Sequence, residues 1–302
     1  RKWIQDTFKI ERPEIARLCD RISSLQTNTS PQKTLESRLF LLIQQEGTSD
    51  RYGIKAAFIQ DIHRYTPQHP IGYEPLEFNI DPFSLEQLTT PPPELLGELI
   101  DRLIEMRLGE LQIEVFLPFN LLDQAVDGWQ CESDYDEPFP IGQDYPLVIR
   151  IWDRLGYKKP YRKVIEWRKK WQEDRFQQSC QELLVCGDRT REEICEDLEL
   201  KEAMGWRKTQ PPQVGKGGEF SIVMREGIPI ALWTRENLEN CCNTEKYQDL
   251  LETPLQDLPK TLKRIRNSTP PDQTHLGHHL ALLWDNPHHI PPDAPLFSND
   301  NC

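Results

Sequence analysis

Short apolar runs in the second half of the chain constrain the fold more than any other feature of the sequence. The run IPIALW at 228–233 is almost entirely apolar, and so is LALLW at 280–284. Strands with one wet face alternate apolar and polar residues, whereas continuous apolar runs are typical of strands covered on both faces. We therefore expect these runs to be buried strands, with helices packed against the sheet that contains them.

The residues before these runs predict a hairpin and the helices that cover the sheet. Two apolar runs flank the turn-forming residues EGTSD at 46–50, a pattern typical of a β-hairpin. The segment 90–110 starts with three prolines and continues with apolar residues spaced as one helical face. Further strands at 111–119 and 145–155 precede helical segments. We predict an α/β fold: a mixed sheet with an N-terminal β-hairpin and flanking helices.

The charge of the chain limits its partners. Its 302 residues carry a formal net charge of −13, which opposes binding to nucleic acid or anionic lipid. A basic segment around WRKKW, 167–171, has the interleaved aromatics of some nucleic-acid-binding helices. However, Val164, Trp167 and Trp171 fall on one helical face, which favours a core role for the tryptophans. No apolar run approaches the roughly 20 residues needed to cross a bilayer. We expect a cytoplasmic protein that binds neither membranes nor nucleic acid.

Three of the predicted strands end alike, with tryptophan followed by two polar residues. These ends are IWDR at 151–154, LWTR at 232–235 and LWDN at 283–286. If the three strands are parallel, their carboxyl ends share the edge at which open α/β sheets place ligand clefts. The candidate binding rim predicted in this way comprises Trp152, Asp153, Arg154, Trp233, Arg235, Trp284 and Asp285.

This recurrence has a structural explanation and a functional one. A strand has to leave the core somewhere, and an indole suits a half-wet boundary. The functional alternative is a polar cleft in which carboxylates and arginines gather. Asp153 and Asp285 could hold Mg²⁺ in a metal-dependent hydrolase or nuclease, or they could pair with Arg154 and Arg235. Carboxylates that are paired with separate arginines would count against the metal.

Five of the seven histidines gather at 275–289 and raise the question of a metal site. His279 and His288 flank the run LALLW, so an extended strand would hold the two groups of histidines about 30 Å apart, which one ion cannot bridge. The eight cysteines form no C-x-x-C pair, and the sequence contains neither G-x-S-x-G nor H-E-x-x-H. We predict reduced thiols, no metal, no cofactor and no catalytic residues, and a buried strand with histidines at its wet ends.

Several segments resemble, in combination and order, the C-terminal domain of the vWA-MoxR-associated proteins, a family of bacterial conflict systems. The likeness runs from about Arg38 to Pro295 and is carried by RLFLLIQQE…YGIKAAFI, IEVFLPFNLLDQAVDGW, YPLVIRIWDRL, WRKKW, IPIALWTR and HHLALLWDNPHHIPP. The resemblance implies genomic neighbours of two kinds, a von Willebrand A-type protein and a MoxR-type AAA+ ATPase. It also implies an effector domain at the N-terminus of the whole protein and a recognition or regulatory role for this domain.

The expected organisation follows from this resemblance. Residues 1–35 are predicted to be a helical segment and linker left from an upstream region. Residues 36–297 are predicted to form the α/β domain, and 298–302 a tail. The expected function is a non-enzymatic module that couples sensing of a partner or invader to the effector. Protein partners, such as the ATPase and the vWA-domain protein, are expected, and the alternative is the hydrolase or nuclease built on the strand-end aspartates.

Overall fold

The structure is a computed structural model, and it describes most of the chain from residue 35 onward. The described residues are 35–77, 81–106, 109–132, 137–156, 161–200, 202–215, 217–237, 239, 244–268 and 275–294. The predicted helical segment and linker before residue 35 lie outside them, as does the predicted tail at 298–302. In the part of the chain that is described, no helix is long and apolar enough to span a bilayer.

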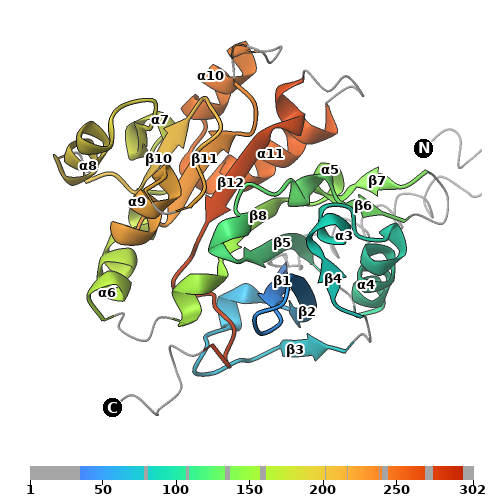
Figure 1. Ribbon diagram of the computed structural model, residues 1–302. Coiled ribbons are helices and arrows are strands. Elements are labelled where there is room, and N and C mark those ends of the chain that lie inside the picture. Colours follow the sequence, from blue (N-terminus) through green and yellow to red (C-terminus); the bar gives the residue numbers. More distant parts are fainter. Residues whose placement is uncertain are drawn as a thin grey trace, which may run out of the picture. The chain divides into compact units, whose positions relative to one another are not determined.

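One mixed sheet organises the described residues, in the order β3-β2-β1-β5-β8-β12-β11-β10-β9, with the short β4 paired to β2 (Figure 1). Its strands are β1 (Glu36–Gln45), β2 (Arg51–Ile59), β3 (Tyr73–Leu76), β4 (Phe83–Ser84), β5 (Glu110–Leu117), β8 (Leu147–Ile151), β9 (Leu184–Cys186), β10 (Gly205–Lys208), β11 (Ile230–Thr234) and β12 (Leu280–Trp284). A separate pair joins β6 (Gln130–Cys131) to β7 (Phe139–Pro140). The predicted α/β class with a mixed sheet is confirmed.

The N-terminal hairpin forms where the sequence predicts it. β1 and β2 are antiparallel, with Leu41 opposite Ala56. Gly47 in the connecting turn has a φ of +61°, a conformation that residues with a Cβ rarely adopt. β1 then pairs in parallel with β5, and β5 with β8, so the hairpin forms one end of the mixed sheet.

One expectation about strand direction is wrong. β12 runs parallel to β8 but antiparallel to β11, with Leu232 opposite Leu282. Between β11 and β12, the described residues include two α-helices, α10 (Thr244–Glu252) and α11 (Leu258–Asn267). A single covering helix would carry the chain to the starting edge of a parallel strand, whereas two successive helices bring it back to the edge from which it left. The carboxyl end of β11 therefore lies at the opposite edge of the sheet from the carboxyl ends of β8 and β12.

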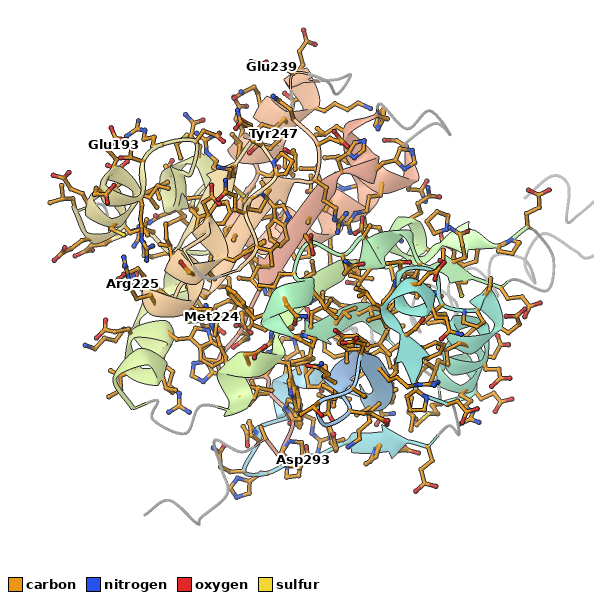
Figure 2. The ribbon with its side chains drawn as sticks, in the orientation of Figure 1. Glu193, Met224, Arg225, Glu239, Tyr247 and Asp293 are labelled. Carbon is orange, nitrogen blue, oxygen red and sulfur yellow. The ribbon has the colours of Figure 1, made fainter. Side chains whose placement is uncertain are left out.

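Helices cover both faces of the sheet because alternate strand residues point to opposite sides. On one face, strand residues such as Leu41, Val115 and Trp233 form one apolar cluster with α3 (Leu85–Thr89), α4 (Pro93–Glu105), α8 (Arg191–Leu200) and α9 (Glu219–Arg225). On the other face, Leu232 and Leu282 pack against α7 (Cys180–Leu183), α10 and α11 (Figure 1). Tyr247 of α10, labelled in Figure 2, is fully buried in this second cluster.

The second face of the sheet carries two apolar clusters. One is the cluster under α10 and α11, and the other joins Phe40 of β1 and Phe116 of β5 to Ile290 near the end of the described chain. Both tryptophans of WRKKW are buried, as predicted, yet they enter different clusters: Trp167 the second and Trp171 the first. α6 (Tyr161–Lys170) and Trp171, the residue after it, therefore connect the two clusters, and polar side chains occupy the sheet between them.

Candidate functional site

A fully buried arginine lies at the centre of these polar side chains. Arg150 belongs to β8, and its side chain has no exposed surface. Its Nε donates to Asp285 Oδ1 at 2.9 Å, and its Nη1 donates to the Glu114 carboxylate of the adjacent strand β5. The remaining hydrogen bonds go to the carbonyl oxygens of Asn286 and His289. Two carboxylates and two carbonyls thus compensate a guanidinium that would otherwise be very costly to bury.

Asp285, directly after β12, is held by a second arginine. Arg154 Nη1 donates to Asp285 Oδ2 at 2.6 Å, while Arg154 Nη2 donates to the carbonyls of Val223 and Ile228. The indole N–H of Trp167 donates to the Asp285 carbonyl, and the Arg154 guanidinium lies 5.2 Å from the Trp167 ring centroid. Each carboxylate oxygen of Asp285 therefore accepts from a different guanidinium.

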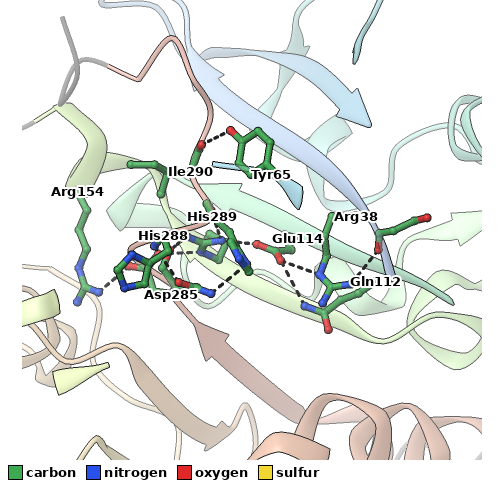
Figure 3. A network of polar contacts seen from close by, with 12 residues as sticks. Arg38, Tyr65, Gln112, Glu114, Arg154, Asp285, His288, His289 and Ile290 are labelled. Carbon is green, nitrogen blue, oxygen red and sulfur yellow. Dashed lines mark hydrogen bonds and ion pairs between the residues drawn. The ribbon is translucent and has the colours of Figure 1, made fainter. Parts of the chain in front are cut away.

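The network fixes the segment 285–294, which we call the C-terminal strap. From the end of β12 the strap crosses to the segment that follows the hairpin, where the Tyr65 hydroxyl donates to the Ile290 carbonyl at 2.5 Å (Figure 3). Burial raises the pKa of the Tyr65 hydroxyl, so it stays a donor. Ile290 itself is fully buried in the cluster with Phe40 and Phe116. The histidine-rich stretch beyond Pro287 is thus an anchored strap.

His289 in the strap is held in its neutral form. Burial, followed by the positive charges of Arg38 and Arg150, lowers the pKa of His289 from 6.5 to about 3. The ring Nδ1 lies 3.0 Å from the side-chain nitrogen of Asn286. A neutral ring accepts that amide hydrogen at Nδ1 and carries its own proton on Nε2.

A cleft of about 1010 Å³ opens beside the network, over the part of the second face that lies between the helices and the strap. Its floor is the polar side of β1 and β5, namely Glu36, Arg38, Gln112 and Glu114. Arg38 Nε lies 3.4 Å from Glu114 Oε1, so the charges of the floor join those of the network. His289 and Asn286 of the strap border the same cleft, so the position of the strap determines part of the shape of the cleft.

The two walls of the cleft differ in chemistry. α11 contributes Lys260, Lys263 and Arg264, and Lys260 forms an ion pair with Glu110 of β5. The other wall holds three aromatic rings, Trp171, Phe176 and Trp284, packed edge to face with centroids 5.0–5.5 Å apart. A cleft that combines aromatic rings, basic groups and a polar floor is the kind of surface that binds a ligand with both apolar and charged groups.

The structure divides the predicted rim between two edges of the sheet. Trp152, Asp153, Arg154, Trp284 and Asp285 lie at the carboxyl ends of β8 and β12, and Trp284 lines the cleft. Trp233 and Arg235 lie at the opposite edge because β11 runs the other way.

The individual contacts of these residues are mostly internal. Asp153 accepts a hydrogen bond from the Phe119 backbone N–H at 2.6 Å. Trp233 is fully buried, with its ring centroid 5.0 Å from that of Phe220. Arg235 pairs with Asp127. A single rim made of all seven residues does not exist, and Arg154 and Asp285 are enclosed in the network.

Neither strand-end aspartate has the surroundings of a metal ligand. Both carboxylate oxygens of Asp285 form ion pairs with arginines, and the Asp153 carboxylate accepts a hydrogen bond from a backbone N–H. Over the described residues, no three histidine, cysteine or carboxylate side chains are placed to hold one ion. Bound metals need ligands whose lone pairs are free for coordination.

The sequence contains a signal for the cleft floor that the strand-end pattern does not use. In ELQIE at 110–114, Glu110, Gln112 and Glu114 alternate with apolar residues, as expected for a strand with one polar face. Glu36 and Arg38 of β1 occupy the same face. Two adjacent strands with a polar face indicate a part of the sheet that no helix covers.

Comparison with known families agrees with the sequence resemblance. The model of the vWA-MoxR associated protein C-terminal domain matches residues 61–287, well over half of the chain. The chain therefore belongs to the vWA-MoxR-associated protein C-terminal domain family. Searches of curated proteins and of solved structures found no significant match.

Proposed function

We propose that this domain is a non-enzymatic recognition module of a bacterial conflict system, which couples the sensing of a partner or an invader to an effector domain. The observation that carries the proposal is the cleft, because it combines an aromatic wall, a basic helix and a charged floor on one face of the sheet. Aromatic and arginine side chains in a recess are the groups that contribute most to protein recognition. Family membership supports the same role.

The alternative, a metal-dependent hydrolase or nuclease using Asp153 and Asp285, has less support. Both oxygens of Asp285 accept from guanidinium groups, and a metal would have to displace two buried ion pairs to reach them. Breaking a buried ion pair costs several kcal/mol, which a metal at this position would have to offset. No observation favours this function over recognition.

The partners that we propose are cytoplasmic proteins, a MoxR-type AAA+ ATPase and a vWA-domain protein. The family description names both classes. The strand-end residues would support partner binding mainly by holding the strap and the aromatic rings in place, rather than by touching the partner. These residues are Trp152, Asp153, Arg154, Asp285 and Trp284. Trp284, which lines the cleft, is the exception.

The test is a charge reversal in the cleft. Lys263→Glu changes the basic wall without touching the buried network, and Lys55→Glu changes an exposed lysine of β2 that does not line the cleft. Affinity for the purified ATPase and vWA protein is measured with and without nucleotide. We expect at least a tenfold loss, about 1.4 kcal/mol, for Lys263→Glu and little change for Lys55→Glu. Equal affinities for both variants would overturn the cleft as the docking surface.

A further inference from the structure

A second cluster of charges lies near the amino-terminal ends of β8 and β12, and none of its residues lines the cleft. Asp127 in the short 3₁₀ turn Val126–Gly128 accepts from Arg235 Nη2 at 2.5 Å. Its other oxygen lies 3.3 Å from Arg266 Nε of α11. Arg266 also donates to the carbonyls of Leu147 and Leu280, so it is fixed between β8 and β12.

The charges of this cluster do not balance. Two guanidinium groups share one carboxylate, and Asp127 and Arg266 are almost completely buried. Among the described residues, the ion pairs of Arg235 and of Arg266 both end on Asp127. Burial and the neighbouring Arg235 lower the pKa of Arg266, in spite of the opposing effect of Asp127. A buried excess of one positive charge is costly unless a counter-ion enters.

Arg235 has the hydrogen-bonding capacity to receive that counter-ion. Its Nη2 is used by Asp127 and by the Gln124 carbonyl. Its Nε and Nη1 are buried and have no hydrogen-bond acceptor within the described chain, which leaves three N–H bonds unused. Buried donors without a partner are rare in proteins and indicate a missing acceptor. The side chain keeps 11% of its surface exposed, so the guanidinium lies just below the surface.

We infer that the Asp127–Arg235–Arg266 cluster is a binding site for one carboxylate group of a small molecule. With one bound carboxylate and Asp127, two negative charges balance the two guanidinium groups. A bound dianion would instead leave an excess of negative charge. Guanidinium groups bind carboxylates through charge-assisted hydrogen bonds, and the unused N–H groups of Arg235 supply them. This inference is independent of the proposed docking cleft, because Asp127, Arg235 and Arg266 do not line that cleft.

The experiment is a comparison of thermal melts in sodium acetate and sodium chloride at equal ionic strength. Acetate that binds only the folded chain raises Tm, by about 2–4 °C when it lies several-fold above its Kd. The acetate-specific shift should disappear in Arg235→Gln and persist in Arg168→Gln, which changes an exposed arginine of α6 outside both the cluster and the cleft. Asp127→Asn, which increases the excess positive charge, should enlarge the shift.

Each outcome decides the inference. Absence of an acetate-specific shift in the wild-type chain overturns it, whatever the variants do. An equal shift in the wild type, Arg235→Gln and Asp127→Asn means that acetate acts elsewhere, and also overturns it. If Arg235→Gln fails to fold, the enlarged shift in Asp127→Asn is the decisive result. A sulfate arm that matches acetate at equal ionic strength would contradict the argument for a single charge.

Discussion

At the scale of single residues, Arg150 has the largest structural role in the second face of the sheet. It joins three strands or segments that are distant in sequence: β5 through Glu114, the end of β12 through Asp285, and the strap through two carbonyls. Arg189, in contrast, has a side chain that is 48% exposed, and it pairs with Asp197 at 3.0 Å. The two arginines make similar ion pairs in very different surroundings.

Replacement of Arg150 by methionine tests this difference. Arg150→Met leaves Glu114 without its main partner in the interior, and we expect a loss of about 3–5 kcal/mol in the free energy of unfolding. Arg189→Met breaks an exposed pair and should cost less than about 1 kcal/mol. Urea unfolding of both variants measures the two values. Similar losses would show that the network is not the main tie between the strap and the sheet.

The lowered pKa of His289 should make the free energy of unfolding depend on pH. Its folded pKa is about 3, below the unfolded value of about 6.5, so the unfolded chain takes up a proton first as the pH falls. The stability that the neutral ring contributes is complete above pH 6.5 and is lost progressively down to about pH 3. His289→Gln should therefore lose less stability than the wild type between pH 6.5 and 4, by up to a few kcal/mol.

The adjacent His288 is the matched control, because it is exposed. His288→Gln should follow the wild-type curve of unfolding free energy against pH. If His289→Gln shows the same slope as His288→Gln, the ring of His289 is not held neutral by burial.

At the scale of secondary structure, periodicity predicted the elements, and the chain's connections decided their directions. The hairpin, α4, and strands β5, β8, β11 and β12 follow from local patterns of apolar residues. The direction of β12 relative to β11 depends on the number of helices between them, which a strand's own sequence does not contain. Pro254 and Pro259 interrupt that linker and are the local signal of a second helix.

The candidate site was predicted less well than the fold, for the same reason. The recurrence of tryptophan and polar residues identified strand ends correctly, but it assumed one edge where there are two. The partners of Asp285, namely Arg150 and Arg154, come from another strand and its following turn, and no spacing in the sequence links them. The polar face of β5 was visible in the sequence, yet its lack of a covering helix is a property of the three-dimensional arrangement.

The end of α6 gives a prediction for this scale. Trp171 is buried against Phe176 and Trp284, so Trp171→Ala should remove about 3–5 kcal/mol from the free energy of unfolding. Ile165→Ala, on the exposed side of the same helix, should cost less than about 1 kcal/mol. Chemical denaturation compares them directly. A Trp171→Ala variant with wild-type stability and lost partner binding would show that the ring serves recognition rather than packing.

At the scale of the whole molecule, the family match begins later in the chain than the sheet does. The match begins at residue 61, after the hairpin, although β1 pairs with β5 and contributes Arg38 and Phe40 to the second face. A chain that begins at residue 61 would expose the edge of β5 and part of two apolar clusters. We expect it to show no cooperative thermal transition, while a chain that begins at residue 35 unfolds cooperatively. Equal transitions would mean that the hairpin is dispensable for folding.

The central claim is that this domain recognises a protein partner through the cleft between α11, the aromatic wall and the polar floor of β1 and β5. Hydrogen–deuterium exchange of the domain, alone and with the purified MoxR-type ATPase, tests it most directly. We expect slower exchange in peptides from β5, α11 and the strap, and unchanged exchange in α3 and α4 on the other face. Protection confined to α3 and α4, or to the turn around Asp127, would contradict it.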